Sequence, residues 1–116
     1  MEIKAKFEEQ TGSLSLLNAI LKEIKIHQEN DYLNAVLHFV IAEGKTLKID
    51  FFNISEYQFY YNDTHIFYNV EDYKFLITDD NKIYISLDPS FETTEANDND
   101  MDFIKAVDFN VEWNND

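Results

Sequence analysis

The sequence has no cysteine, no arginine, two glycines and one proline in 116 residues. Without cysteine the chain forms no disulfide and no thiolate metal site, so its fold does not depend on an oxidising compartment. Gly12 and Gly44 alone cannot build a glycine-rich loop that cradles phosphate. Without arginine, the bidentate contact that proteins often make to phosphate or guanine is also missing.

Long apolar runs and sorting signals are absent as well. The longest apolar runs fall far short of the ~18 residues that a membrane-spanning helix needs. The first ten residues, MEIKAKFEEQ, lack the basic, then apolar, then small-residue pattern of a secretory signal. We therefore expect a cytoplasmic protein that neither enters nor spans a membrane. Its hydrophobic content of 45% predicts one folded domain over residues 1–116.

Charge is distributed unevenly along the chain. The formal net charge is −14, and residues 1–49 carry six lysines against seven acids, whereas residues 50–116 carry three lysines against 16 acids. Such a chain repels phosphate backbones, so direct nucleic-acid binding is not expected. Its field attracts a basic protein, including the basic cleft of a nucleic-acid enzyme. The alternative is that the acidity only keeps an aromatic-rich β protein soluble.

Alternating apolar residues predict strands through most of the chain. In the stretch Lys45–Tyr61, KTLKIDFFNISEYQFYY, the alternation predicts two aromatic-rich strands joined by a corner at residues 53–56. Similar alternation occurs in segments 24–27, 33–41, 66–68, 73–77, 83–87 and 104–113. We predict a mainly β (α+β) fold, an antiparallel meander of seven to eight short strands forming a sandwich or partly open barrel.

One short N-terminal helix is expected beside these strands. Ser13–Leu21 is the best candidate, because a serine can cap it and its leucines follow helical spacing. Met1–Gly12 is then interpreted as an edge strand or a loose arm. Phe91–Met101 is acidic, poor in apolar residues and rich in turn-forming residues, so we expect an exposed loop.

Metal-binding patterns are incomplete. Residues 98–102, DNDMD, resemble the opening of a calcium loop, but Phe103 and Phe109 occupy the positions that need a glycine and a bidentate carboxylate. The three histidines lie on or beside separate predicted strands and show no close pairing that a zinc site would use: His27, His38 and His65. We predict no metal site and no cofactor.

Catalytic patterns are equally scarce. There is no nucleophile elbow, and the serines lie in cap, strand or turn contexts: Ser13, Ser15, Ser55, Ser86 and Ser90. The 23 acids allow many carboxylate pairs, so no single pair is informative. We predict no catalytic residue and expect that the protein is not an enzyme.

The aromatic residues of the middle third are too many for one face of a sheet. Tyr60 is out of phase with Tyr57, Phe59 and Tyr61, so some rings must lie on the opposite face. Tyrosine beside carboxylate is typical of a protein-recognition surface. Alternatively, the rings reflect ordinary β-propensity, with a core on both sides of the sheet.

The segment Leu33–Leu87 carries a resemblance to a known group. An alternating strand leads to LKIDFFNI at residues 47–54, then Tyr57, then a series of short hairpins. This pattern is similar to small, acidic, β-rich bacterial immunity proteins encoded beside polymorphic toxins. It covers about half the chain and includes no motif from which a functional residue can be transferred. The resemblance implies one-to-one neutralisation of a partner, often a nuclease.

These observations lead to a functional hypothesis of a non-enzymatic acidic protein that occludes a basic partner, such as a nuclease toxin or another nucleic-acid-handling protein. Carboxylates of the C-terminal half would face the partner's cations, and exposed tyrosines would anchor it. The candidate residues are Tyr60, Tyr61, Asp63, Glu71, Asp72, Asp79, Asp80, Asp98, Asp100 and Asp102. Two alternatives stay open, a small-ligand-binding β-barrel or sandwich and a homo-oligomeric structural module, including a homodimer.

Overall fold

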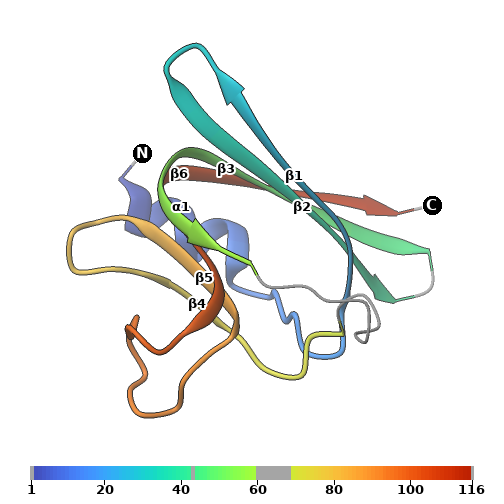
Figure 1. Ribbon diagram of the computed structural model, residues 1–116. Coiled ribbons are helices and arrows are strands. Elements are labelled where there is room, and N and C mark those ends of the chain that lie inside the picture. The colour runs from blue at the N-terminus through green and yellow to red at the C-terminus, as the bar shows by residue number, and fades with distance from the viewer. Residues whose placement is uncertain (1, 43, 60–68, 116) are drawn as a thin grey trace.

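The computed structural model describes residues 2–42, 44–59 and 69–115, which form one twisted antiparallel sheet and one helix (Figure 1). The strand order across the sheet is β1-β2-β3-β6-β5-β4. The elements are α1 (Ile3–Thr11), β1 (Ile20–Glu29), β2 (Tyr32–Ala42), β3 (Lys45–Gln58), β4 (Lys74–Ile77), β5 (Ile83–Asp88) and β6 (Met101–Asn115).

This architecture confirms the prediction of a mainly β, antiparallel fold with one short helix. In the described residues the sheet has six strands and is not closed into a barrel. It is also not a simple meander, because β6 lies between β3 and β5 and joins two three-strand meanders. The predicted strand at residues 66–68 lies outside the described residues.

The corner predicted within the stretch Lys45–Tyr61 is a bend inside a single strand. The pairing of β2 with β3 ends at Ala35 and Phe51, whereas β6 follows β3 as far as Gln58. At the point of divergence Asn53 has a φ of 57°, and its N–H donates to the side-chain oxygen of Asn34 at 2.9 Å. Asparagine tolerates this left-handed conformation better than most residues do. The bend therefore separates β3 from β2, while β3 stays paired with β6 through a register shift between Ile54 and Glu56.

The helix lies N-terminal to its predicted position. Ser13–Leu21 is not helical: Asn18 has a φ of 67°, and its N–H donates to the carbonyl of Val70 at 2.8 Å. The leucine spacing misled the prediction because Leu16 is buried from an irregular segment that leads into a turn at Leu17 and Asn18. The expected edge strand or arm at Met1–Gly12 instead contains α1.

Helix α1 covers the core face of the sheet over β4 and β6 (Figure 1). The Phe7 ring meets Phe75 edge-on at 5.1 Å between centroids and lies 6.1 Å from Phe109. Ile3, one turn earlier, packs against the same core. The i, i+4 pair of Ile3 and Phe7 is the sequence signal that locates this helix.

The position of α1 predicts a difference between two phenylalanine truncations. Phe7→Ala should lower the free energy of unfolding by about 2–3 kcal/mol, because it empties the contact between helix and sheet. Phe91→Ala is the matched control, since Phe91 is 75% exposed, and should change it by less than about 0.5 kcal/mol. Urea unfolding measures both, and equal effects would contradict the placement of α1.

Candidate functional site

The acidic loop between β5 and β6 is held against the sheet by one buried carboxylate. Asp100 is 2% exposed. It accepts hydrogen bonds from Lys74 Nζ at 2.9 Å and from the Tyr84 hydroxyl at 2.6 Å. It also accepts from the backbone N–H groups of Ser90 at 2.7 Å and Asn97 at 2.9 Å. The four donors thus come from β4, β5 and two widely separated points of the loop.

Lys74 completes this cluster from the edge strand. Its side chain is 7% exposed, and its ammonium group also donates to the carbonyl of Glu95 at 2.7 Å. Taking an ammonium and a carboxylate out of water is costly unless both find good partners. Here each ion has the other and at least one further hydrogen bond. The pair therefore ties β4 to the loop at both Glu95 and Asp100.

The loop covers the face of β5 that points away from the core. Ile83 and Ile85 belong to the hydrophobic core, and Tyr84 and Ser86 alternate with them on the opposite face. Tyr84 and Ser86 are nevertheless buried, because they hydrogen-bond to Asp100 and to the carbonyl of Met101. Burial of β5 from Ile83 to Leu87 thus results from the core on one side and the loop on the other.

The cluster lowers the pKa of Asp100 and raises the pKa of Tyr84. Burial raises the pKa of Asp100, but hydrogen bonds from Lys74, Tyr84 and the two amides outweigh it and hold this pKa below its ordinary 3.8. Burial, together with the hydrogen bond to the Asp100 carboxylate, raises the pKa of the Tyr84 hydroxyl above its ordinary 10. At neutral pH Asp100 is therefore charged and Tyr84 is neutral, as the observed hydrogen bond requires.

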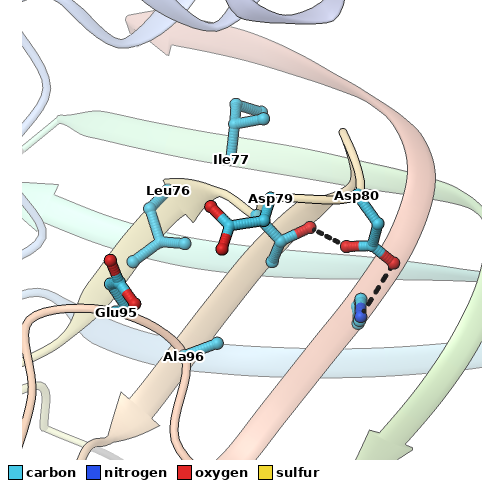
Figure 2. A pocket seen from close by; sticks show the side chains of 8 residues that line it. Leu76, Ile77, Asp79, Asp80, Glu95 and Ala96 are labelled. Atoms are coloured by element: carbon cyan, nitrogen blue, oxygen red, sulfur yellow. Dashed lines mark hydrogen bonds and ion pairs between the residues drawn. The ribbon is translucent and has the colours of Figure 1, made fainter.

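Beside this anchor the chain exposes a group of carboxylates, which we call the acidic lobe: Asp79, Asp80, Glu92, Glu95 and Asp98. The first two lie on the β4–β5 turn and the others on the loop. The two segments meet at an open hollow of about 230 Å³, whose lining includes Asp79, Asp80 and Glu95 (Figure 2). The hollow thereby places Asp79 and Asp80 beside Glu95, which is 15–16 positions away in the sequence.

Asp80 is the member of the lobe with a cationic neighbour. Its carboxylate accepts a hydrogen bond from the Thr78 hydroxyl at 2.5 Å and pairs with Lys105 Nζ at 3.1 Å (Figure 2). The Thr78 hydrogen bond and then that of Lys105 lower the pKa of Asp80. In the described part of the chain, no ion pair forms with Asp79, Glu92, Glu95 or Asp98. Their charge is therefore available to a partner.

The residues predicted to bind a partner separate into three groups. Three are exposed members of the acidic lobe, Asp79 and Asp80 on the β4–β5 turn and Asp98 on the loop between β5 and β6. Glu71 and Asp72, also exposed, lie in the segment before β4. Asp100 and Asp102 are buried instead, at 2% and 5% exposure, so neither presents its carboxylate to solvent. Tyr60, Tyr61 and Asp63 lie outside the described residues.

The sequence predicted that Asp100 contacts a partner, whereas the structure buries it, and no role was predicted for Lys74 or Tyr84. Asp100 was assigned to the surface because its neighbours are acidic, yet a carboxylate with four donors is stable inside. A signal was present: Lys74 begins the otherwise apolar strand KFLI, and Tyr84 alternates with the core residues of β5. Glu92 and Glu95 were also not selected.

The described residues contain neither a group of metal ligands nor a membrane-spanning helix. No three histidine or acidic side chains converge as metal ligands within residues 2–42, 44–59 and 69–115. No helix in this part of the chain is long and apolar enough to cross a membrane. Comparisons with protein-family models, curated proteins and solved structures gave no match to this chain.

The first prediction from this site concerns the buried ion pair. Asp100→Asn should lower the free energy of unfolding by about 3 kcal/mol, because Lys74 would remain buried without its counter-ion. Lys74→Met should act similarly, and the double variant should lose at least about 1 kcal/mol less than the sum. Asp98→Asn, the same change at an exposed position, should cost less than about 0.5 kcal/mol. Additive effects in urea unfolding would contradict the pairing.

A second prediction concerns pH. Because the pKa of Asp100 is lower in the folded state, its contribution to stability is present above the ordinary value of 3.8 and is lost as pH falls below it. The stability difference between wild type and Asp100→Asn should therefore shrink as pH falls from about 7 to about 3. Urea unfolding at several pH values measures it. A difference that is constant over this range would show that the carboxylate is not held in its charged form.

Proposed function

We propose that this chain is a non-enzymatic acidic binding protein that occludes a basic protein partner. In this proposal the acidic lobe takes the place that phosphates would occupy in the cleft of a nuclease-type toxin or another nucleic-acid-handling protein. The protein would then act as a cytoplasmic immunity or inhibitor protein. The observation that carries the proposal is the acidic lobe itself, five exposed carboxylates assembled from two segments.

The charge balance around the acidic lobe supports this proposal. Three lysines lie in the C-terminal half, and each is already engaged: Lys74 with Asp100, Lys105 with Asp80, and Lys82 with the Ser55 hydroxyl. The lobe is therefore only partly neutralised by its own chain. Such a surface accelerates the encounter with a cationic surface and disfavours acidic partners.

The rigidity of the support is a second argument. The loop that carries Glu92, Glu95 and Asp98 is fixed by Asp100 through bonds to the Ser90 and Asn97 amides. A surface that is ordered before binding loses less conformational entropy when a partner arrives. This preorganisation suits an inhibitor that must bind tightly, although the charged residues themselves are exposed.

A small-ligand-binding sandwich or partly open barrel is the alternative. It would need an enclosed apolar cavity. The hollow in Figure 2 is open, and Asp79, Asp80, Glu95 and Lys105 contribute to its lining. This chemistry gives more support to contact with a cationic protein surface.

The partner can be sought by capture on the immobilised protein from its own cells at low salt. We expect one basic protein, identified by mass, to elute sharply as the salt concentration rises, because exposed charge pairs are screened. If nothing basic is retained, or if the bound protein resists about 500 mM salt, the electrostatic proposal is wrong.

Matched charge variants then test the surface. Glu92→Gln/Glu95→Gln/Asp98→Asn should lower the association rate by about tenfold and weaken its salt dependence. Glu2→Gln/Glu8→Gln/Glu9→Gln removes the same charge from exposed positions near the N-terminus and should change the association rate much less. Stopped-flow or surface-based kinetics measures both, and equal rates for the two variants would exclude the acidic lobe as the contact.

A further inference from the structure

The end of β6 and the outer side of β1 both lack a neighbouring strand but differ in their protection. The pairing of β6 with β5 ends at Ala106, and no other described strand pairs with that side of β6 beyond it. There the side-chain oxygen of Gln10 accepts from the N–H of Val111 at 2.7 Å, and the carboxylate of Asp108 accepts from the N–H of Phe109 at 2.8 Å. These side chains occupy amides that an added strand would need.

The outer side of β1 has no such protection within the described residues. β1 pairs with β2 along one side, and on the other side a single bridge joins Ile20 to Asn69. The register shifts between Leu21 and Glu23, and both the bulge and Lys22 discourage pairing at this end. The regular stretch Glu23–Glu29 continues into the tip of the β1–β2 hairpin, which projects beyond the rest of the sheet (Figure 1).

A second copy of the chain fits this edge, for reasons of charge. Residues 20–29 carry two lysines and two glutamates, so β1 is neutral within a chain of net charge −14. It is also the sheet edge opposite β4, which leads into the acidic lobe. The molecule measures about 34 × 33 × 31 Å, and charges are largely screened beyond about 8–10 Å at physiological salt. Two copies that meet at β1 therefore keep their acidic lobes apart.

The order of charges along β1 is self-complementary in particular registers. A two-fold axis perpendicular to the sheet makes two β1 strands antiparallel and pairs residues whose side chains share a face. If the axis passes beside Ile24, Glu23 of each copy lies opposite Lys25 of the other copy. If the axis passes beside His27, Lys25 of each copy lies opposite Glu29 of the other copy. The side chains of Lys25 and Glu23 are exposed and lie 3.8 Å apart as an ion pair within β1, and a pair across the axis would replace this contact.

The two registers with the axis between these positions are unfavourable. If the axis passes beside Lys25, the Lys25 side chains of the two copies lie opposite each other. If it passes beside Ile26, Glu23 of each copy lies opposite Glu29 of the other copy. In each favourable register Lys25 faces an acid. The same contact would also cover Ile26, which is 36% exposed on the edge.

We propose that β1 pairs antiparallel with β1 of a second copy, extending the two sheets into one and placing the two acidic lobes at its far ends. This proposal does not depend on the identity of any other partner. An interface of one strand pair is small, so the dimer is in rapid exchange with the monomer.

Sedimentation of the purified chain, residues 1–116, tests this dimer. The mass should rise from 13.8 kDa towards twice that value as concentration increases from about 10 to about 500 µM. Lys25→Glu should raise the dissociation constant by about tenfold or more, because it opposes like charges in both registers. Lys4→Glu on α1 is the control with the same charge change at an exposed position and should leave association unchanged.

Compensating variants identify the register. Glu23→Lys/Lys25→Glu should restore association if the axis lies at Ile24, and Lys25→Glu/Glu29→Lys should restore it if the axis lies at His27. Circular dichroism confirms that each variant is folded. The proposal is overturned by a wild-type chain that stays monomeric throughout this range, by a Lys25→Glu variant that associates like Lys4→Glu, or by rescue in neither double variant.

Discussion

The buried ion pair between Lys74 and Asp100 is the interaction on which the C-terminal half of this structure depends. β4 is a four-residue edge strand, and the loop that follows β5 has no strand of its own until Met101. Both are joined through one carboxylate that four donors surround. A single buried charge is stable only with such complete satisfaction. The positions of the exposed acids are consequences of this arrangement.

The N-terminal half depends on a different constraint, the bend in β3. Because Asn53 adopts a left-handed conformation and bonds to Asn34, β3 leaves β2 but remains paired with β6. This separation leaves the tip of the β1–β2 hairpin extended beyond the sheet. It also lets β6 carry pairing from one half of the sheet to the other. The same bend thus connects the two halves and leaves residues 32–34 of β2 unpaired with β3.

The sequence was sufficient for the class of fold, because alternation in segments such as Leu33–Ile41 and Ile83–Leu87 reflects real strands. It was insufficient for the helix, since the spacing of Leu14, Leu17 and Leu21 satisfies a helical pattern although the chain there is irregular, with a turn, until β1 begins at Ile20. The acidic lobe was recognised in part through Asp79, Asp80 and Asp98. The burial of Asp100 could not be inferred from local pattern, because its partners lie 10 to 26 residues away in the sequence apart from Asn97.

The most direct test of this account is amide hydrogen exchange at Ser90 and Asn97, measured by NMR. Both amides lie in a loop without strand pairing, and both donate to the buried Asp100 carboxylate. If the ion pair fixes the loop as described, their exchange should be slower by about 100-fold or more than that of the neighbouring Thr94 amide. Exchange of Ser90 and Asn97 as fast as that of Thr94 would show that Asp100 does not hold the loop in place.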